Sequence, residues 1–103
     1  MSAQVTYEFP VRCAGAGVNQ EIMIPVSADI FGVGFRKKEC DIVVYYNCFA
    51  DERRRRHSVI FVVVSNDEVF SAPPGYGYIP IGSVRDGGDK AWHVYQQANV
   101  SDL

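Results

Sequence analysis

The residues best suited to chemistry form one basic run: Arg53, Arg54, Arg55, Arg56 and His57. A guanidinium group binds phosphate or carboxylate through paired hydrogen bonds, so the run could anchor a nucleic acid, a small anionic ligand or an acidic protein. Asp51 and Glu52 precede it and partly neutralise its charge. Alternation along an extended strand would also divide the arginines between two faces. These two observations favour the alternative, a solvated hairpin end whose charges prevent edge-to-edge pairing.

A second candidate is the segment 73–78, where two tyrosines stand among proline and glycine residues. Tyrosine combines a large apolar ring with a hydroxyl group, and this combination is common in protein interfaces. Tyr76 and Tyr78 are therefore candidate contacts for a partner. The alternative is that their rings fold back and cover the open end of a β-barrel.

The spacing of the remaining polar residues does not assemble a catalytic site. Ser83, Asp86 and His93 have the residue types of a hydrolase triad, but nothing in their positions requires them to meet. The Gly-x-Gly sequences at 32–34 and 75–77 do not stand between a strand and a helix, where glycine-rich loops hold phosphate. The three cysteines lack a CxxC spacing, which favours reduced thiols over a zinc site. We therefore predict no enzyme activity, no cofactor and no metal.

The size and charge of the chain narrow the classes of protein to which it can belong. With 103 residues, 48% of them hydrophobic and 13% aromatic, it suits one globular domain. Its net charge of -2 gives no overall attraction to nucleic acid or to an anionic membrane. The longest apolar runs are too short to span a bilayer, and the first ten residues lack the pattern of a secretory signal. We therefore expect a cytoplasmic protein without a membrane segment.

The elements that hold the candidate residues have the pattern of β-strands. Pro10 and Pro25 place their strands at sheet edges or strand ends, because proline cannot donate to a ladder. Residues 42–46 and 58–64 are continuously apolar and rich in β-branched side chains, which is typical of central strands covered on both faces. No stretch has the apolar spacing of a helix over several turns.

The strand at 30–35 carries two glycines on one face. Alternation puts Phe31, Val33 and Phe35 on one side of this strand and Gly32 and Gly34 on the other. A face without side chains accepts close approach, so another backbone or a large aromatic ring could lie against these glycines.

Two turns complete the pattern, because polar residues 36–39 and glycine-rich residues 86–89 each join adjacent apolar segments in a hairpin. We count about six to seven short strands. The sequence therefore predicts an all-β fold, either a single small antiparallel β-barrel or a two-layer β-sandwich. Residues 1–97 would form the domain, and residues 98–103 a frayed C-terminal tail.

Three segments have a recognisable combination of residues. The first is Tyr-Glu-Phe-Pro-Val at 7–11, and the second is the pair of segments at 23–26 and 30–35. The third is a closing hairpin at 78–95, with Ile-Gly-Ser-Val, Gly-Gly and Trp-His-Val-Tyr in order. Together they resemble a family of small uncharacterised proteins from tailed bacteriophages and prophages. The middle of the chain, 53–77, departs from that family.

This resemblance implies a phage or prophage origin and action in the bacterial cytoplasm. The family brings no established activity, cofactor or catalytic residue, so no site is transferred to this chain. We predict a non-catalytic, phage-type binding protein that acts on a host or defence protein through a loop or a sheet edge. One alternative is a binder of nucleic acid or small anions that uses Arg53–Arg56. Another is a self-associating structural component that pairs through edge strands near 5–9 or 91–95.

Overall fold

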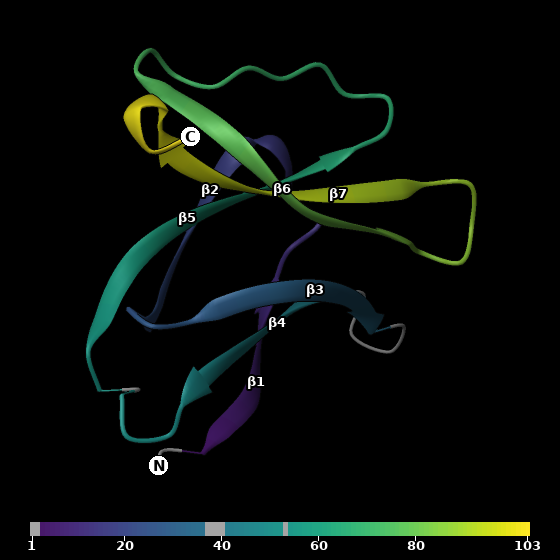
Figure 1. Cartoon of the computed structure of the whole chain (residues 1–103). Helices are drawn as coiled ribbons and strands as arrows, with labels where there is room; N and C mark the ends of the chain where they lie inside the picture. The colour runs from purple at the N-terminus through teal and green to yellow at the C-terminus, as the bar shows by residue number, and fades with distance from the viewer. Residues whose placement is uncertain (1–2, 37–40, 53) are drawn as a thin grey trace.

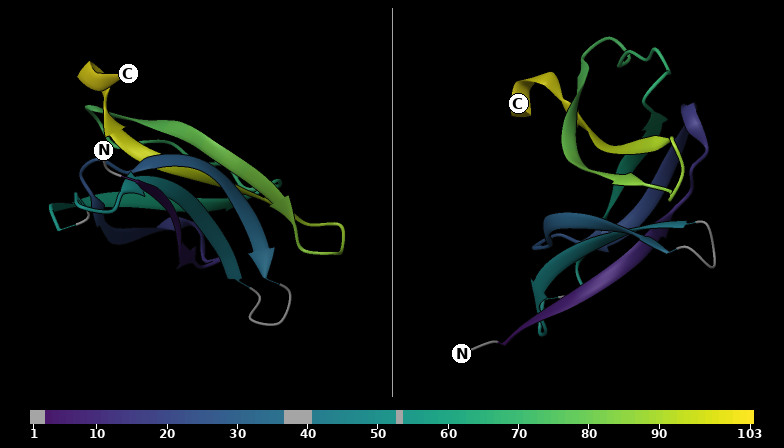
Figure 2. Two further views of the ribbon diagram at one scale, coloured as in Figure 1. Left: turned by 60° about the horizontal axis from the view of Figure 1, so that its bottom comes forward. Right: turned by 90° about the vertical axis from the view of Figure 1, so that its right-hand side faces the viewer.

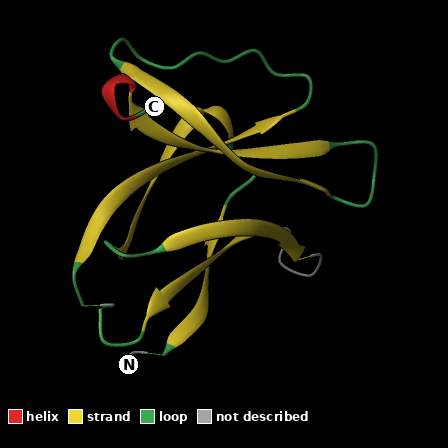
Figure 3. Cartoon of the chain, in the orientation of Figure 1, coloured by secondary structure: helices red, strands yellow, loops and turns green. Residues whose placement is uncertain are grey.

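Seven antiparallel strands form the protein in the computed structural model, which describes residues 3–36, 41–52 and 54–103 (Figure 1). The strands are β1 (Gln4–Val11), β2 (Gly15–Pro25), β3 (Asp29–Arg36), β4 (Asp41–Phe49), β5 (Arg56–Ser65), β6 (Tyr76–Arg85) and β7 (Ala91–Asn99). Within these ranges the only helical element is a short 3-10 helix, η1 (Val100–Asp102) (Figure 3). The predicted all-β fold is confirmed.

The strands belong to two sheets that lie as separate layers (Figure 2). Sheet A has the order β1-β4-β3, and sheet B has the order β2-β5-β7-β6. The sheets do not close into a barrel, so the fold is sandwich-like. The two predicted hairpins are confirmed as β3–β4 and β6–β7. Of the first predicted turn, 36–39, residues 37–39 lie outside the described residues.

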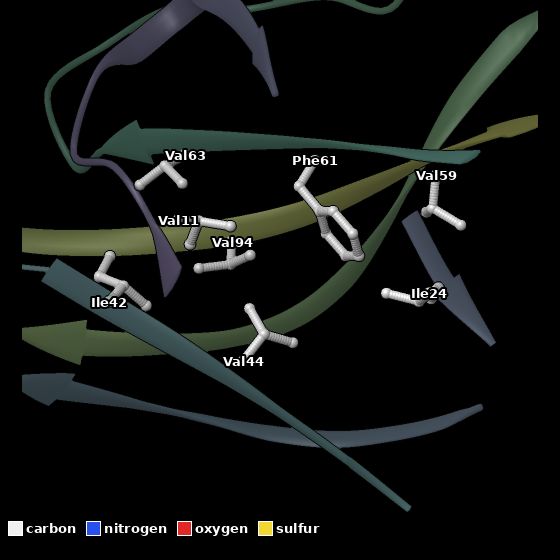
Figure 4. Close-up of a cluster of buried hydrophobic side chains, with 8 residues drawn as sticks. All are labelled: Val11, Ile24, Ile42, Val44, Val59, Phe61, Val63 and Val94. Carbon is white, nitrogen blue, oxygen red and sulfur yellow. The ribbon is translucent and has the colours of Figure 1, made fainter. Parts of the chain in front are cut away.

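The core lies between the two sheets (Figure 4). Its buried cluster consists of Val11, Ile24, Ile42, Val44, Val59, Phe61, Val63 and Val94. Figure 4 shows Ile24 and Val59 at one end of this cluster. Val43, Val62 and Val64 point away from it and are nevertheless buried. The prediction that β4 and β5 are covered on both faces is therefore confirmed.

The outer face of sheet B is covered by the long connection from β5 to β6. Phe70 in this connection packs against Tyr78 and Tyr95, with ring centroids 5.5 and 4.9 Å apart. Tyr95 is the cross-strand neighbour of Val62, so the aromatic cluster lies over the valines of β5. The connection thus covers this face of sheet B, as a further layer of secondary structure would in other proteins.

An aromatic ring lies over one of the two glycines of β3. A Cβ atom on Gly34 would lie 3.0 Å from the Tyr45 hydroxyl, whereas one on Gly32 would meet nothing within 4 Å. The expected ring is therefore present at Gly34. The expected orientation of Phe31 is wrong, because a register shift between Ile30 and Gly32 turns it towards Tyr45.

Proline marks the open edges of the sandwich. Pro10, Pro25 and Pro80 lie in β1, β2 and β6, which are edge strands of their sheets. The edge positions expected from Pro10 and Pro25 are confirmed. An edge at 91–95 is wrong, because β7 lies between β5 and β6. Proline on these edges opposes the addition of a further strand, including one from a second copy.

The chain remains paired almost to its end. Ala98 and Asn99, which we placed in a frayed tail, belong to β7 and pair with Gly77 and Tyr76. The backbone N–H of Val100 then donates to the Gly75 carbonyl at 3.0 Å, and η1 follows. No helix among the described residues is long and apolar enough to cross a membrane.

Candidate binding site

Strands β5 and β7 separate at one end of sheet B. Their ladder runs from Ser65↔Trp92 to Phe61↔Gln96 and ends there. Beyond that point β5 continues beside β2, while β7 continues beside β6. Figure 1 shows β5 curving away from β7 on the left of the view. We call the space between the diverging strands the split.

The backbone of β5 presents polar groups to the split. The N–H of Val26 donates to the carbonyl of Arg55, in the register that joins β2 to β5. Because bonding directions alternate along an antiparallel strand, the odd-numbered residues of β5 bond to β2. Ser58 therefore directs its backbone N–H and carbonyl groups into the split. Ile60 directs its N–H there, while its carbonyl faces the Gln97 N–H at the last rung of the ladder.

The same reasoning applies to β7 on the opposite side. The N–H of Val100 donates to the carbonyl of Gly75, in the register that joins β6 to β7. The even-numbered residues at this end of β7 therefore bond to β6. It follows that Asn99 directs its backbone groups into the split, towards β5, and that Gln97 directs its carbonyl there, because its N–H faces the Ile60 carbonyl at the last rung of the ladder.

Two hollows meet at the split. One has a volume of about 320 Å³ and lies between His57–Ile60 on β5 and Gln96–Asn99 on β7, with Tyr76 and Asp102 also in its wall. The other has a volume of about 370 Å³ and lies between the inner face of sheet B and the start of β3. They share His57, Val59 and Gln96 and form one depression, which we call the end groove.

The end groove has a mixed lining, with aliphatic side chains in its floor and polar groups over much of its accessible surface. The floor contains the aliphatic side chains Ile24, Ile30, Val59, Ile79 and Ile81. Asp29 and His57 stand among the wall residues. Val26 and Phe31 also line it and are each 55% exposed, and Tyr76 is 43% exposed. Large exposed apolar side chains beside a recess of mixed polarity are typical of a protein-binding surface.

The predicted arginine run is divided by the structure. Arg54 and Arg55 lie in the turn between β4 and β5, and Arg53 lies outside the described residues. Arg55 lines a third, smaller hollow together with Val26, which also belongs to the end groove. Arg56 begins β5 and donates from Nη1 to the Met23 carbonyl at 3.3 Å. Of the described residues of the run, only His57 lines the end groove itself.

The two predicted tyrosines have different environments. Tyr76 lines the end groove with His57, so the structure brings together one residue from each candidate segment. Tyr78 instead packs against Phe70 and Tyr95 on the outer face of sheet B. Its ring thus serves packing, although it covers a sheet and not the end of a barrel.

The chain matches no protein-family model, and no curated protein or solved structure is similar to it. The function must therefore be argued from the groove and from the chemistry of its residues.

The possible hydrolase residues do not form a triad. Ser83 Oγ and His93 Nδ1 share a hydrogen bond of 2.7 Å, because the two residues are cross-strand neighbours. The Asp86 carboxylate instead accepts the Gly88 backbone N–H at 2.9 Å. A catalytic triad needs an acid that orients the histidine, and Asp86 is engaged in its own turn. No cluster of three metal-ligating side chains occurs in the part of the chain that the structure describes.

Two carboxylates outside the groove have lowered pKa values, and both hold the backbone. Glu68 accepts hydrogen bonds from the backbone N–H groups of Ala16 and Ser65, at 2.9 and 2.8 Å, and these lower its pKa. A hydrogen bond from Ser65 Oγ is the main cause that lowers the pKa of Asp67. Glu68 thereby joins the start of β2 to the end of β5, which is a structural role.

Sequence reasoning missed most of the groove. Val26, Phe31, Gln96 and Gln97 gave no signal, because a groove between strands depends on where a ladder ends. The divergence does coincide with a change in composition: β5 begins Arg-His-Ser, and β7 ends Gln-Gln-Ala-Asn. Polar residues at the corresponding ends of two neighbouring strands are the signal that could have located it.

Proposed function

We propose that the protein is a non-catalytic binding module that holds a protein partner in the end groove. One observation supports this above all: sheet B divides and leaves a groove open, with the large apolar side chains Val26, Phe31 and Tyr76 exposed around it. The centres of protein interfaces are rich in apolar and aromatic side chains and are surrounded by polar ones. The end groove has this composition.

The total surface of the chain is consistent with a missing partner. Its accessible surface is 6607 Å² for a mass of 11.5 kDa, whereas folded monomers of that mass expose roughly 5,800 Å². The difference of about 800 Å² means that the chain exposes more surface than a compact monomer of its mass, and a partner that covered part of it would reduce this excess. The molecule is also flat, with extents of 45 × 36 × 17 Å.

The expected partner is a protein of the bacterial cytoplasm that belongs to the host or its defences. The resemblance of segments 7–11, 23–35 and 78–95 to tailed-phage proteins supports this choice. The groove itself supports only a protein surface with an apolar centre.

The proposal is tested with paired baits that differ only in the groove. Wild-type protein, Phe31→Asp and Val69→Asp are used to capture proteins from bacterial lysate, and the captured protein is identified and purified. Val69 is the matched control because it is 98% exposed and does not line the groove. We expect Phe31→Asp to weaken binding of the purified partner by about tenfold or more. Equal binding by all three proteins would refute the proposal.

The second candidate function is binding of an anionic ligand at the turn between β4 and β5. Arg54 and Arg55 are exposed there and form no ion pair within the described residues. Arg54→Ala with Arg55→Ala should then abolish binding of single-stranded DNA or RNA, and wild-type binding should weaken steeply with salt. Absence of binding at low salt would exclude this function.

A further inference from the structure

We infer that the end groove holds an extended peptide segment of the partner, which enters the split and forms backbone hydrogen bonds with β5 and β7. This inference rests on the proposed function and specifies its partner as an unstructured linear segment. Addition of a strand is an established mode of peptide recognition, in which the main chain provides affinity and the side-chain pockets provide specificity.

The first argument is the position of the backbone groups. Ser58 on one side and Asn99 on the other direct N–H and carbonyl groups beyond the end of the ladder. The N–H of Ile60 and the carbonyl of Gln97 also face the split. A strand that already belongs to a sheet has only one free edge, so it could pair with only one side of the split. A linear segment has two free edges and could pair with both.

The second argument is a buried acceptor in the wall of the split. Among the described residues, the side-chain oxygen Oε1 of Gln97 is buried without a hydrogen-bond partner. Buried polar groups are almost always satisfied in folded proteins. A peptide in the split would supply backbone N–H donors beside Gln97, which lines this hollow.

The third argument is that the ordinary places for strand addition are blocked. Three of the four edge strands contain proline: β1, β2 and β6. The fourth, β3, lies against β6, and a Cβ on Gly82 would lie 2.8 Å from the Val33 side chain. The split therefore offers the accessible backbone that the outer edges of the sandwich do not.

The floor of the groove specifies the kind of segment. Successive side chains of a strand point to opposite faces, so alternate residues of the peptide would face the inner hollow. That hollow contains Ile24, Ile30, Ile79 and Ile81 and selects aliphatic or aromatic side chains. The segment expected is thus polar overall, with large apolar residues at alternate positions.

The split makes a prediction for the free protein, which amide hydrogen exchange tests residue by residue. The amides of Ser58, Ile60 and Asn99 should exchange fast, whereas those of Val62 and Tyr95, inside the ladder, should be protected. Equal protection of both groups would mean that the ladder continues and would overturn the inference.

The bound state is tested with short linear peptides selected from a displayed random library on the intact protein. Binding should protect the amides of Ser58, Ile60 and Asn99 and leave those of Val59 and Ala98, which bond to other strands, unchanged. Selected sequences should share apolar residues at alternate positions. Failure to select any peptide, or protection elsewhere, would overturn the inference.

A substitution at Ser58 separates the inference from the proposed function. Ser58→Pro removes the N–H that faces the split but no hydrogen bond to β2, so we expect peptide affinity to fall roughly tenfold. Ser58→Ala keeps that N–H and should bind as wild type. If Phe31→Asp prevents binding and Ser58→Pro does not, the groove is the binding site but no strand is added. If Ser58→Pro does not fold, the amide exchange pattern of the wild-type protein, free and with peptide, still tests whether a strand is added.

Discussion

The two ends of the β5–β7 pair differ, although the same two strands form both. From Phe61 to Ser65 the strands are hydrogen-bonded, and the side chains of Phe61, Val63 and Val94 are fully buried. From His57 to Ile60, β5 is separated from β7 and lines a hollow. One end therefore stabilises the domain, and the other exposes backbone and apolar surface that can bind.

The physical cause of this difference lies in the residues and in what covers them. At the closed end, valines face both sides of β5, and Glu68 fixes the chain that follows it. At the open end, β5 begins with Arg56, His57 and Ser58, all exposed, while its pairing with β2 continues. Because these three side chains are polar, pairing this end of β5 with β7 would bury little apolar surface and would contribute little to the free energy of folding.

The largest expected effect comes from truncating one aromatic ring at each end. Phe61→Ala should lower the free energy of unfolding by about 3–5 kcal/mol, because the ring is fully buried and its loss leaves a cavity. Phe31→Ala should cost only about 1 kcal/mol or less, because that ring is half exposed. Urea unfolding of both variants gives these values. Equal losses would show that the open end contributes to stability as the core does.

A smaller effect is expected from adding one methyl group where β3 meets β6. Gly82→Ala should destabilise the protein by about 1–3 kcal/mol, because the new Cβ would lie 2.8 Å from Val33. Gly32→Ala is the control, since a Cβ there meets nothing within 4 Å. It should be neutral or stabilise by up to about 1 kcal/mol through the unfolded state. Thermal or urea unfolding distinguishes them, and a neutral Gly82→Ala would mean that the two sheets shift apart easily.

Sequence reasoning located the closed end and could not locate the open one. The valine runs of β4 and β5 predicted central strands, and Pro10 and Pro25 predicted edges, because both signals are local properties of a strand. The same local reasoning misplaced Phe31, since a register shift reverses the face of every later or earlier residue. It also assigned His57 and Tyr76 to two different candidate sites, although both line the end groove where β5 and β7 diverge. Where a ladder ends depends on the pairing of four strands, and no single segment encodes it.

A pH-dependent effect on stability should appear at the closed end. The hydrogen bonds from Ala16 and Ser65 hold the pKa of Glu68 below its usual 4.5. A lowered pKa means that the folded state favours the carboxylate, so its contribution to stability is present above pH 4.5. This contribution is lost as the pH falls through the lowered value. Urea midpoints measured from pH 6 towards pH 3 should therefore decline.

The variant Glu68→Gln isolates the contribution of this carboxylate. It should show a weaker decline in stability with falling pH, and the amides of Ala16 and Ser65 should exchange faster. Glu21→Gln removes the same charge from an exposed position and should retain the wild-type decline. Identical pH profiles for wild type and Glu68→Gln would show that Glu68 does not hold β2 to β5.

The smallest effect is expected from the ion pair between Glu8 and Arg36, which bridges β1 and β3 across β4. Both side chains are nearly half exposed, at 41% and 46%, so water and salt screen their attraction. A double-mutant cycle with Glu8→Gln and Arg36→Gln should give a coupling of about 0.2–1 kcal/mol at low salt and less at high salt. Val43 beneath them lies between Pro10 and Gly34 in the sheet and stays buried through packing. A larger, salt-independent coupling would mean that charge, and not apolar packing, closes this face of sheet A.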